Sequence, residues 1–357
     1  MKTAIIGLPM TGKTSLFTIL TGVTQESRIG STAVRTGVSK VPDPRVDALA
    51  ELYQPPKITF ATVEYIDVPA ISKETLRDPA YLASLRVVDA FAHVLRVFQD
   101  ETVPHEHGTV DPARDFDDVE TELILSDMVV VEKRLERVDK DRKKVRNPDL
   151  DKEWELLTRC KEALDANTPL RNLEFDKEDE KRIRGFQFLS QKPMLLVLNL
   201  GEEDAARLHE VEEKYRTGPL AGKAHTAVTA VCGKIEAELA ELPAEDAREY
   251  LLSYGLKESG LQRIISATYG LLGLMSFLTA GDTEVRAWTI PIHSTAVVAA
   301  GAIHSDFEKK FIRAEVVNWK SLVDLGGYPG VREKGLLRLE GKEYIVKDGD
   351  VLVIRHS

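Results

Sequence analysis

The sequence predicts an α/β fold with a largely parallel sheet, an inserted pair of long helices and a small β-rich domain at the end of the chain. Five short apolar runs are separated by helical patterns, as expected for buried parallel strands joined by helical crossovers. Between residues 115 and 190 the apolar residues instead recur at four-three spacing among dense charges. After residue 277, closely spaced glycines divide short alternating segments, which favours a β domain. We therefore expect three domains, formed by residues 1–114 with 191–276, by residues 115–190, and by residues 277–357.

The five apolar runs predict the strands of the sheet. Each is short, apolar almost throughout and bounded by polar or turn-forming residues, as a strand buried on both faces should be. In a parallel sheet the loops that follow the strands meet at one edge, and ligands bind there. The expected strands are residues 3–6, 62–66, 90–97, 193–198 and 227–231.

The middle region predicts an antiparallel helical hairpin with a coiled-coil seam. The run Asn147-Pro148-Asp149 breaks the first helical pattern before a second apolar helix face begins. The charges over residues 132–144 fit a solvated helix face, and a binding patch is the alternative. The seam residues are Ile124, Met128, Val131, Leu135, Val138 and Val145 on the first helix, and Trp154, Leu157, Cys160 and Leu164 on the second.

The C-terminal domain is expected to end in paired strands. Residues 336–354 alternate apolar and polar positions around an Asp-Gly pair, which predicts a hairpin, a tight turn and a final strand. Phe311, Arg313 and Trp319 combine aromatic rings with charge, a mixture that serves either RNA contact or the core of a small β domain.

The composition argues against several classes of protein. Of the 357 residues, 43% are hydrophobic and 30% charged, and no apolar run approaches the ~20 residues that a membrane span needs. A net charge of −10 argues against a nucleic-acid binder that relies on charge alone. Cys160 and Cys232 lie far apart without further ligands at metal spacing, so neither a disulfide framework nor a zinc site is expected. We expect a cytoplasmic protein that does not associate with membranes.

Residues 7–14, Gly-Leu-Pro-Met-Thr-Gly-Lys-Thr, directly follow the first expected strand. Their spacing is that of a phosphate-binding loop, in which glycines let backbone N–H groups turn toward phosphate oxygens. Lys13 is expected to reach the β- and γ-phosphates and to be the catalytic residue, and Thr14 to ligate Mg²⁺. Asp67, at the end of the second expected strand, is the other expected metal residue, as a second-sphere carboxylate of Mg²⁺, with a plain turn residue as the alternative. The sequence thus predicts a site for a nucleotide with Mg²⁺.

The loops after the fourth and fifth expected strands occupy the positions that read the base. In Ras-like GTPases the first of these loops reads Asn-Lys-x-Asp, and its aspartate binds the edge of guanine. Here Leu200 replaces the lysine, and Glu202, one methylene longer, replaces the aspartate. Losing the aspartate removes the main discrimination against adenine. We therefore expect ATP to be preferred over GTP.

With these residues in place, the chain resembles the YchF family, the Obg-like ATPases, over nearly its whole length. The most specific matches lie in the C-terminal part, which is similar to the TGS domain of that family. The matching stretches are residues 7–17, 41–45, 87–94, 199–204, 234–239, 277–281, 284–289, 304–309 and 311–316.

The resemblance implies a P-loop NTPase domain, an inserted helical hairpin and a ubiquitin-like β-grasp TGS domain. It implies a preference for ATP and an association with the ribosome or RNA through the TGS domain and the hairpin. It also implies that Asn199 and Leu200 contact the adenine, with Cys232, Gly233 and Lys234 flanking it. The residues expected to bind nucleotide are Leu8, Pro9, Met10, Thr11, Gly12, Lys13, Thr14, Ser15, Asn199, Leu200, Glu202, Cys232, Gly233 and Lys234.

Departures from the family leave the question of hydrolysis open. Asp67-Val68-Pro69-Ala70 lacks the glycine whose N–H would sense the γ-phosphate, and residues 75–85 contain no glycine, so a helix is expected there. The first switch lacks the usual asparagine before Gly37, which leaves Ser31, Thr32 or Thr36 as alternative Mg²⁺ contacts. The leading hypothesis is slow hydrolysis of ATP to ADP and phosphate. A nucleotide-bound scaffold without turnover, and a GTPase, are the alternatives.

The histidines are weaker candidates. His105-Glu106-His107 has the residue types of a metal site, but it lies in a polar loop without a third ligand nearby in the sequence. Solvent exposure is therefore expected for this run. His93, within the third expected strand, is expected to be a core residue.

Overall fold

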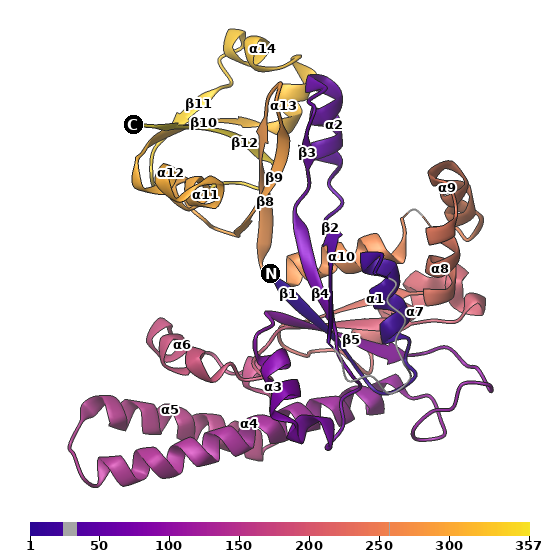
Figure 1. The fold of residues 1–357 in the computed structure, drawn as a ribbon, viewed down its shortest axis with the longest axis vertical. Coiled ribbons are helices and arrows are strands. Elements are labelled where there is room, and N and C mark those ends of the chain that lie inside the picture. The colour runs from indigo at the N-terminus through magenta and orange to yellow at the C-terminus, as the bar shows by residue number, and fades with distance from the viewer. Residues whose placement is uncertain (24–33, 257) are drawn as a thin grey trace. The chain divides into compact units, whose positions relative to one another are not determined.

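The computed structural model describes residues 1–23, 34–256 and 258–357, and its contacts divide the chain into two compact units (Figure 1). The first unit comprises Met1–Val38 and Glu64–Leu271, and the second comprises Ser39–Val63 and Leu272–Ser357. The helical hairpin belongs to the first unit. Residues 39–63, which the sequence analysis assigned to the nucleotide-binding domain, pack instead with the C-terminal residues.

The first sheet has the strand order β2-β4-β1-β5-β6-β7. Parallel ladders join β1 to β4 and β5, and join β6 to β5 and β7. All five strands expected from the apolar runs are present within a residue or two, and the edge strand β2 is an addition. The strands are β1 (Lys2–Ile6), β2 (Arg35–Lys40), β4 (Thr62–Asp67), β5 (Ala90–Arg96), β6 (Met194–Asn199) and β7 (Thr226–Val231).

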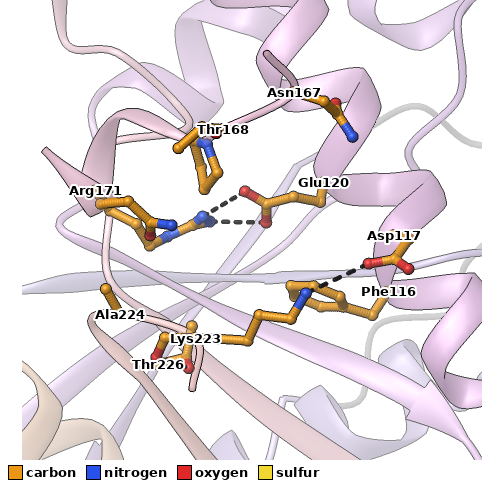
Figure 2. A pocket seen from close by; sticks show the side chains of 11 residues that line it. Phe116, Asp117, Glu120, Asn167, Thr168, Arg171, Lys223, Ala224 and Thr226 are labelled. Carbon is orange, nitrogen blue, oxygen red and sulfur yellow. Dashed lines mark hydrogen bonds and ion pairs between the residues drawn. The ribbon is translucent and has the colours of Figure 1, made fainter. Parts of the chain in front are cut away.

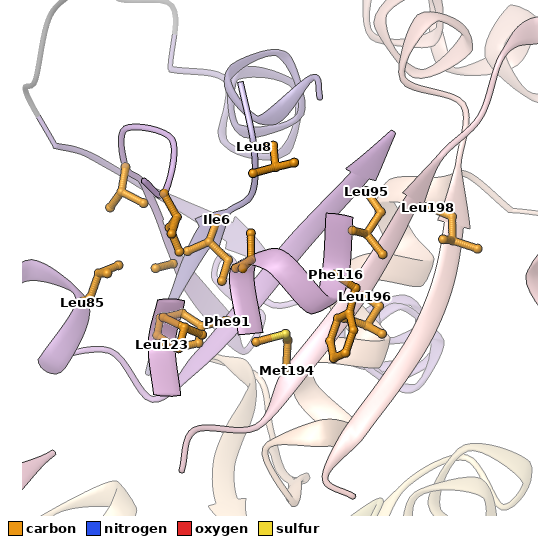
Figure 3. Close-up of a cluster of buried hydrophobic side chains, with 14 of the residues drawn as sticks. Ile6, Leu8, Leu85, Phe91, Leu95, Phe116, Leu123, Met194, Leu196 and Leu198 are labelled. Carbon is orange, nitrogen blue, oxygen red and sulfur yellow. The ribbon is translucent and has the colours of Figure 1, made fainter. Parts of the chain in front are cut away.

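The core of the first unit forms where helices cover this sheet. Every residue of β5 and β6 is buried, which explains why these strands read as continuous apolar runs. Phe91 of β5, Phe116 and Leu123 of α4 and Leu196 of β6 belong to one cluster of buried side chains (Figure 3). The helices of this unit outside the hairpin are α1 (Lys13–Thr21), α3 (Pro79–Arg86), α6 (Lys177–Ile183), α7 (Leu208–Thr217), α8 (Gly233–Glu241), α9 (Ala244–Ser253) and α10 (Gly260–Leu271).

The hairpin consists of α4 (Pro112–Arg142) and α5 (Pro148–Asp165), which lie side by side (Figure 1). The expected break is confirmed, because the Asn147 side chain accepts a hydrogen bond of 2.9 Å from the Asp149 N–H and caps α5. The seam is confirmed for most positions, which share one cluster of buried or partly buried side chains. Val145 is the exception, since it lies beyond the end of α4 and is exposed.

Buried charges fasten the base of the hairpin. Arg171 donates two hydrogen bonds to the Glu120 carboxylate of α4, at 2.5 and 2.9 Å, and lines a small pocket of about 180 Å³ with it (Figure 2). Asp127 of α4 accepts hydrogen bonds from the backbone N–H groups of Leu189 and Ser190, just before β6. Removing one member of such a buried pair costs about 3–5 kcal/mol, so the base of α4 is held firmly against the sheet.

The second unit is a mixed sheet with the strand order β11-β10-β12-β8-β9-β3. Its apolar face, with Phe277 and Val316, shares a core with Ala296, Ala299 and Ala300 of α11. The expected hairpin within residues 336–354 is wrong, because β11 and β12 each pair with β10, whereas the turn at Gly349 and the final strand are confirmed. The elements are α2 (Pro44–Tyr53), β3 (Ile58–Thr59), β8 (Leu274–Ala280), β9 (Val285–Pro291), α11 (Ala296–Ile303), α12 (Ser305–Lys309), β10 (Phe311–Asn318), α13 (Trp319–Asp324), α14 (Tyr328–Glu333), β11 (Arg338–Glu340) and β12 (Asp350–His356).

Two expectations about single residues are also resolved. Phe311 is buried in the core of the second unit, whereas Arg313 is exposed, so the aromatic ring serves packing. Cys160 and Cys232 are both free and buried. Within the described part of the chain, none of the helices has the length and apolar character that crossing a membrane requires.

Candidate nucleotide-binding site

Residues 7–12 form a tight loop between β1 and α1. Gly7 and Gly12 have φ values of +144° and +94°, which residues with a side chain rarely adopt. A Cβ on Gly7 would lie 2.6 Å from the Val94 carbonyl oxygen, and one on Gly12 would lie 2.5 Å from Asn199 Nδ2. Both glycines are therefore required by conformation and by close approach. The loop opens onto the start of α1, where free N–H groups favour an anion.

Lys13 folds back into this loop. Its side chain is buried, and its Nζ donates a hydrogen bond of 2.5 Å to the Leu8 carbonyl oxygen. Burial lowers the pKa of Lys13 to about 8, although the Asp67 carboxylate partly opposes the shift. A phosphate beside the ammonium would favour its charged form further, so the loop is suited to an anionic ligand.

Asp67, the last residue of β4, lies beside the start of α1. The Thr14 hydroxyl donates a hydrogen bond of 3.1 Å to Asp67 Oδ2, and the Arg35 guanidinium forms an ion pair with the same oxygen. The other oxygen, Oδ1, is buried and has no hydrogen-bond partner among the described residues. A hydroxyl and a carboxylate oxygen are the ligands that Mg²⁺ prefers, so these residues fit the expected metal site. Of the alternative contacts, Thr36 is exposed, while Ser31 and Thr32 lie outside the described residues.

Asn199 connects the phosphate-binding loop to the next segment of the site. Its Nδ2 donates a hydrogen bond of 3.0 Å to the Thr11 carbonyl oxygen, and its Oδ1 accepts one of 3.1 Å from the Gly233 N–H at the start of α8. Both functional atoms of the amide thus have protein partners. This linking role, which ties three loops together, was not visible in the sequence.

A pocket of about 530 Å³ continues from the loop along the carboxyl ends of β5, β6 and β7. It brings Met10, Gly12 and Ser15 together with the residues expected to read the base, Asn199, Leu200, Glu202, Gly233 and Lys234. Cys232 is buried and does not line the pocket, and Pro9 and Thr14 are exposed outside it. The pocket is also lined by Phe98, Gln99, Asp100 and Val103, which the sequence analysis missed.

Two of the charged residues that line this pocket form an ion pair. Lys234 Nζ lies 2.5 Å from Glu202 Oε2. This pairing neutralises the charge of Glu202, which replaces the guanine-binding aspartate of Ras-like GTPases. Leu200 is buried, and its N–H is bonded to the Val231 carbonyl oxygen at 2.8 Å, so it contributes a fixed apolar surface.

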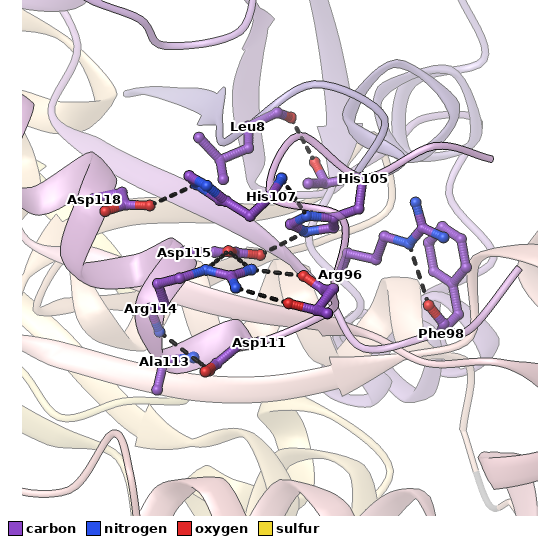
Figure 4. A network of polar contacts seen from close by, with 12 residues as sticks. Leu8, Arg96, Phe98, His105, His107, Asp111, Ala113, Arg114, Asp115 and Asp118 are labelled. Atoms are coloured by element: carbon purple, nitrogen blue, oxygen red, sulfur yellow. Dashed lines mark hydrogen bonds and ion pairs between the residues drawn. The ribbon is translucent and has the colours of Figure 1, made fainter. Parts of the chain in front are cut away.

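Arg96, the last residue of β5, supports the wall of the pocket formed by residues 98–100 and 103 (Figure 4). This arginine is buried, and its guanidinium donates hydrogen bonds to the carbonyl oxygens of Phe98, Asp100, Val103 and Pro104 at 3.0 to 3.3 Å. It also lies over the Phe98 ring, at 4.4 Å from the centroid. The signal of this wall in the sequence was an arginine near the end of an apolar run, at Arg96.

The expectation that residues 105–107 are simply exposed is wrong for His105. Its side chain is buried, and its Nε2 lies 2.9 Å from Asp115 Oδ2 (Figure 4). His107, Asp115 and Asp118 also have potential ligand atoms within 4.8 Å of one another. The carboxylates come from the first turns of α4, where periodicity indicated only an amphipathic helix. Each imidazole is already paired with one of these carboxylates.

Several hydrogen bonds stabilise the turn that follows Asp67. The Ile71 N–H donates to the Gly7 carbonyl oxygen at 3.2 Å, the Tyr81 hydroxyl donates to the Pro69 carbonyl oxygen at 2.9 Å, and the Thr75 hydroxyl donates to the Ala70 carbonyl oxygen at 3.1 Å. The next residues form a short 3₁₀ turn and α3, so the expected helical segment is confirmed.

Together, a lysine-bearing phosphate loop, a carboxylate beside its threonine and a base-sized pocket at the carboxyl ends of parallel strands define a P-loop nucleotide-binding protein. Similarity to known proteins identifies the family more closely. The chain is 40% identical over 364 residues to a protein of Bacillus subtilis (strain 168) named "Ribosome-binding ATPase YchF", covering 100% of this chain and 99% of the relative. A protein of Pasteurella multocida (strain Pm70) with the same name is 39% identical, with the same coverage. The chain therefore belongs to the YchF family.

The structural comparison agrees with this assignment. The fold superposes on the "Structure of the Schizosaccharomyces pombe YchF GTPase" with a TM-score of 0.85 and 28% identity, covering 99% of this chain and 97% of that one. A family model named YchF-GTPase_C, described as "Protein of unknown function (DUF933)", matches residues 274–357. The α/β fold with an inserted hairpin and a C-terminal β domain is thus confirmed.

Proposed function

We propose that this chain is a slow, Mg²⁺-dependent ATPase that acts at the ribosome in the cytoplasm. The observation that carries the ATP assignment is the ion pair between Glu202 and Lys234. The Lys234 ammonium lies at Glu202 Oε2, so a guanine edge would have to compete with it for that oxygen. Adenine makes no such demand, so the pocket favours it.

The phosphates of ATP would lie in the loop of residues 7–14. Backbone N–H groups at the start of α1 and the Lys13 ammonium would hold them, and Thr14 and Asp67 would hold Mg²⁺. When bound, Mg²⁺ supplies positive charge to the β- and γ-phosphate oxygens. Lys13 adds a second positive charge in a buried position, where electrostatic stabilisation of a transferring phosphoryl group is strong. Leu8, Pro9, Met10, Thr11, Gly12 and Ser15 complete the proposed phosphate contacts. Leu200, Gly233 and Lys234 surround the proposed base position, and Cys232, which does not line the pocket, precedes Gly233 in the chain.

The hydrogen-bonded turn after Asp67 supports a second candidate function, that of a nucleotide-bound scaffold without turnover. In P-loop proteins with a mobile second switch, a glycine N–H follows the γ-phosphate. Here Ala70 stands in that place, and the carbonyl oxygens of Pro69 and Ala70 are bonded to Tyr81 and Thr75. These bonds must break before the turn can move, which is compatible with slow hydrolysis or with none.

Action at the ribosome is proposed from family membership. The relatives from Bacillus subtilis and Pasteurella multocida are named ribosome-binding ATPases. We propose the second unit and the hairpin, with its exposed charged faces, as the surfaces that contact the ribosome or its RNA.

A competition experiment tests the base assignment. ATP and GTP are titrated against a fluorescent ATP analogue bound to the purified chain with Mg²⁺. We expect ATP to compete at least tenfold better than GTP, and the opposite order would make the chain a GTPase. Single-turnover incubation with Mg²⁺ and ATP separates the enzyme from the scaffold: phosphate release within an hour supports the enzyme, and intact ATP supports the scaffold.

A further inference from the structure

Arg35 places a positive charge directly on the proposed metal-binding carboxylate. Its guanidinium forms an ion pair with Asp67 Oδ2, the same oxygen that accepts the hydrogen bond from Thr14. Only 12% of the Arg35 side chain and 7% of the Asp67 side chain are exposed, so solvent screens this pair weakly.

A second contact holds the guanidinium at this position. Its central carbon lies 5.1 Å from the centroid of the Phe17 ring of α1. The ring provides a favourable cation–π contact, and the planar guanidinium suits both partners. Arg35 thus lies between an aromatic face and a carboxylate. This carboxylate is one of the two groups that fit Mg²⁺.

A guanidinium and Mg²⁺ cannot both be stable beside Asp67. Cations separated by about 4 Å in a partly buried site repel each other strongly, and Oδ2, the carboxylate oxygen bonded to the Thr14 hydroxyl, is already paired with Arg35. Mg²⁺ binding therefore requires Arg35 to leave Asp67.

We propose that Arg35 is a built-in counter-ion that competes with Mg²⁺ for Asp67 and so determines the Mg²⁺ concentration at which the chain takes up its nucleotide. Arg35 neutralises Asp67 while the metal is absent, which reduces the repulsion between this carboxylate and the phosphates. The inference rests on the proposed nucleotide site and adds to it a residue that determines its dependence on Mg²⁺.

The test measures Mg²⁺ dependence, separately from turnover. Binding of a fluorescent ATP analogue is followed while Mg²⁺ is raised from an EDTA-buffered zero, for the wild type, Arg35→Met and Arg35→Gln. The control is Arg134→Met, which removes an arginine paired with Glu153 in the hairpin, at 2.7 Å. We expect the half-saturating Mg²⁺ concentration to fall at least tenfold in both Arg35 variants and to stay unchanged in the control. In EDTA, both Arg35 variants should bind the analogue at least threefold more weakly than the wild type.

A half-saturating Mg²⁺ concentration within twofold of the wild type would overturn the proposal. A higher one would also overturn it, by showing that Arg35 contacts the bound nucleotide. The Asp67→Asn background adds a second check, because there Arg35→Met should change the Mg²⁺ dependence less than twofold. An undiminished effect in that background would mean that Arg35 acts elsewhere.

A separate measurement distinguishes failure of this inference from failure of the proposed function. If no protein, the wild type included, binds the ATP analogue, the proposed function is wrong. Binding of Mn²⁺ to the nucleotide-free proteins, followed by electron paramagnetic resonance, then decides the role of Arg35. We expect at least tenfold tighter Mn²⁺ binding by Arg35→Met, and equal binding by both proteins would refute the competition.

Discussion

Replacing Asn199 by alanine tests whether this residue links the loops or reads the base. The substitution removes the hydrogen bonds to the Thr11 carbonyl oxygen and from the Gly233 N–H. Each bond contributes about 1 kcal/mol net, so the connected loop arrangement should lose about 2 kcal/mol. Since 1.4 kcal/mol corresponds to a factor of ten, nucleotide affinity should fall roughly 30-fold.

The pattern across nucleotides distinguishes the two roles. If Asn199 orders the phosphate loop, ATP, ADP and GTP should all lose affinity by a similar factor, because all three use that loop. If Asn199 contacts adenine, the loss should be concentrated on the adenine nucleotides. Displacement of a fluorescent analogue gives the three affinities, and urea unfolding checks that the variant remains folded.

Asn199→Asp is the matched control. A carboxylate keeps the acceptor for the Gly233 N–H but cannot donate to the Thr11 carbonyl oxygen. We expect an affinity between those of the wild type and Asn199→Ala. An Asn199→Ala protein with unchanged affinity for all three nucleotides, or with a loss for ATP and ADP alone, would refute the linking role.

Three further predictions concern single side chains. Lys13→Ala should abolish any ATP turnover of the wild type, because it removes the buried charge from the phosphate loop; undiminished phosphate release would show that the site is elsewhere. Arg96→Met should leave four carbonyl oxygens of the pocket wall without their charged donor and weaken nucleotide binding at least tenfold, whereas Arg134→Met should not, as measured by the same displacement assay. His93 is buried, and burial together with the charges of Lys13 and Arg171 lowers its pKa to about 3. Its neutral form therefore contributes stability that is complete above the unfolded pKa of about 6.5 and is lost as the pH falls toward 3, by up to about 1.4 kcal/mol per pH unit. Burial raises the pKa of Asp127 to about 6, and this shift increases the stability of the folded state as the pH falls. The free energy of unfolding by urea is therefore measured at pH 7 and pH 5 and compared between the wild type and His93→Phe. Between these pH values, the free energy of unfolding of His93→Phe should fall by about 2 kcal/mol less than that of the wild type. Equal decreases would contradict the low pKa assigned to His93.

Local patterns were sufficient for much of this fold. The five buried strands were predictable because both of their faces are covered, which makes their sequences continuously apolar. The hairpin was predictable because its seam repeats and because Asn147-Pro148 starts the second helix. The expected hairpin at residues 336–354 was wrong because alternation indicates a strand without naming its partner, and both β11 and β12 pair with β10.

The sequence by itself determined the phosphate loop, since the glycines, Lys13 and Thr14 act within eight consecutive residues and their geometry is local. It also determined which loops follow the central strands, and hence where a base would lie. Only the tertiary structure decided three contacts. Asn199 forms hydrogen bonds with both Thr11 and Gly233, Arg96 supports the pocket wall, and Arg35 forms an ion pair with Asp67. These contacts join residues from different strands and loops, and their partners are chosen by the register of the sheet, which no short stretch of sequence encodes.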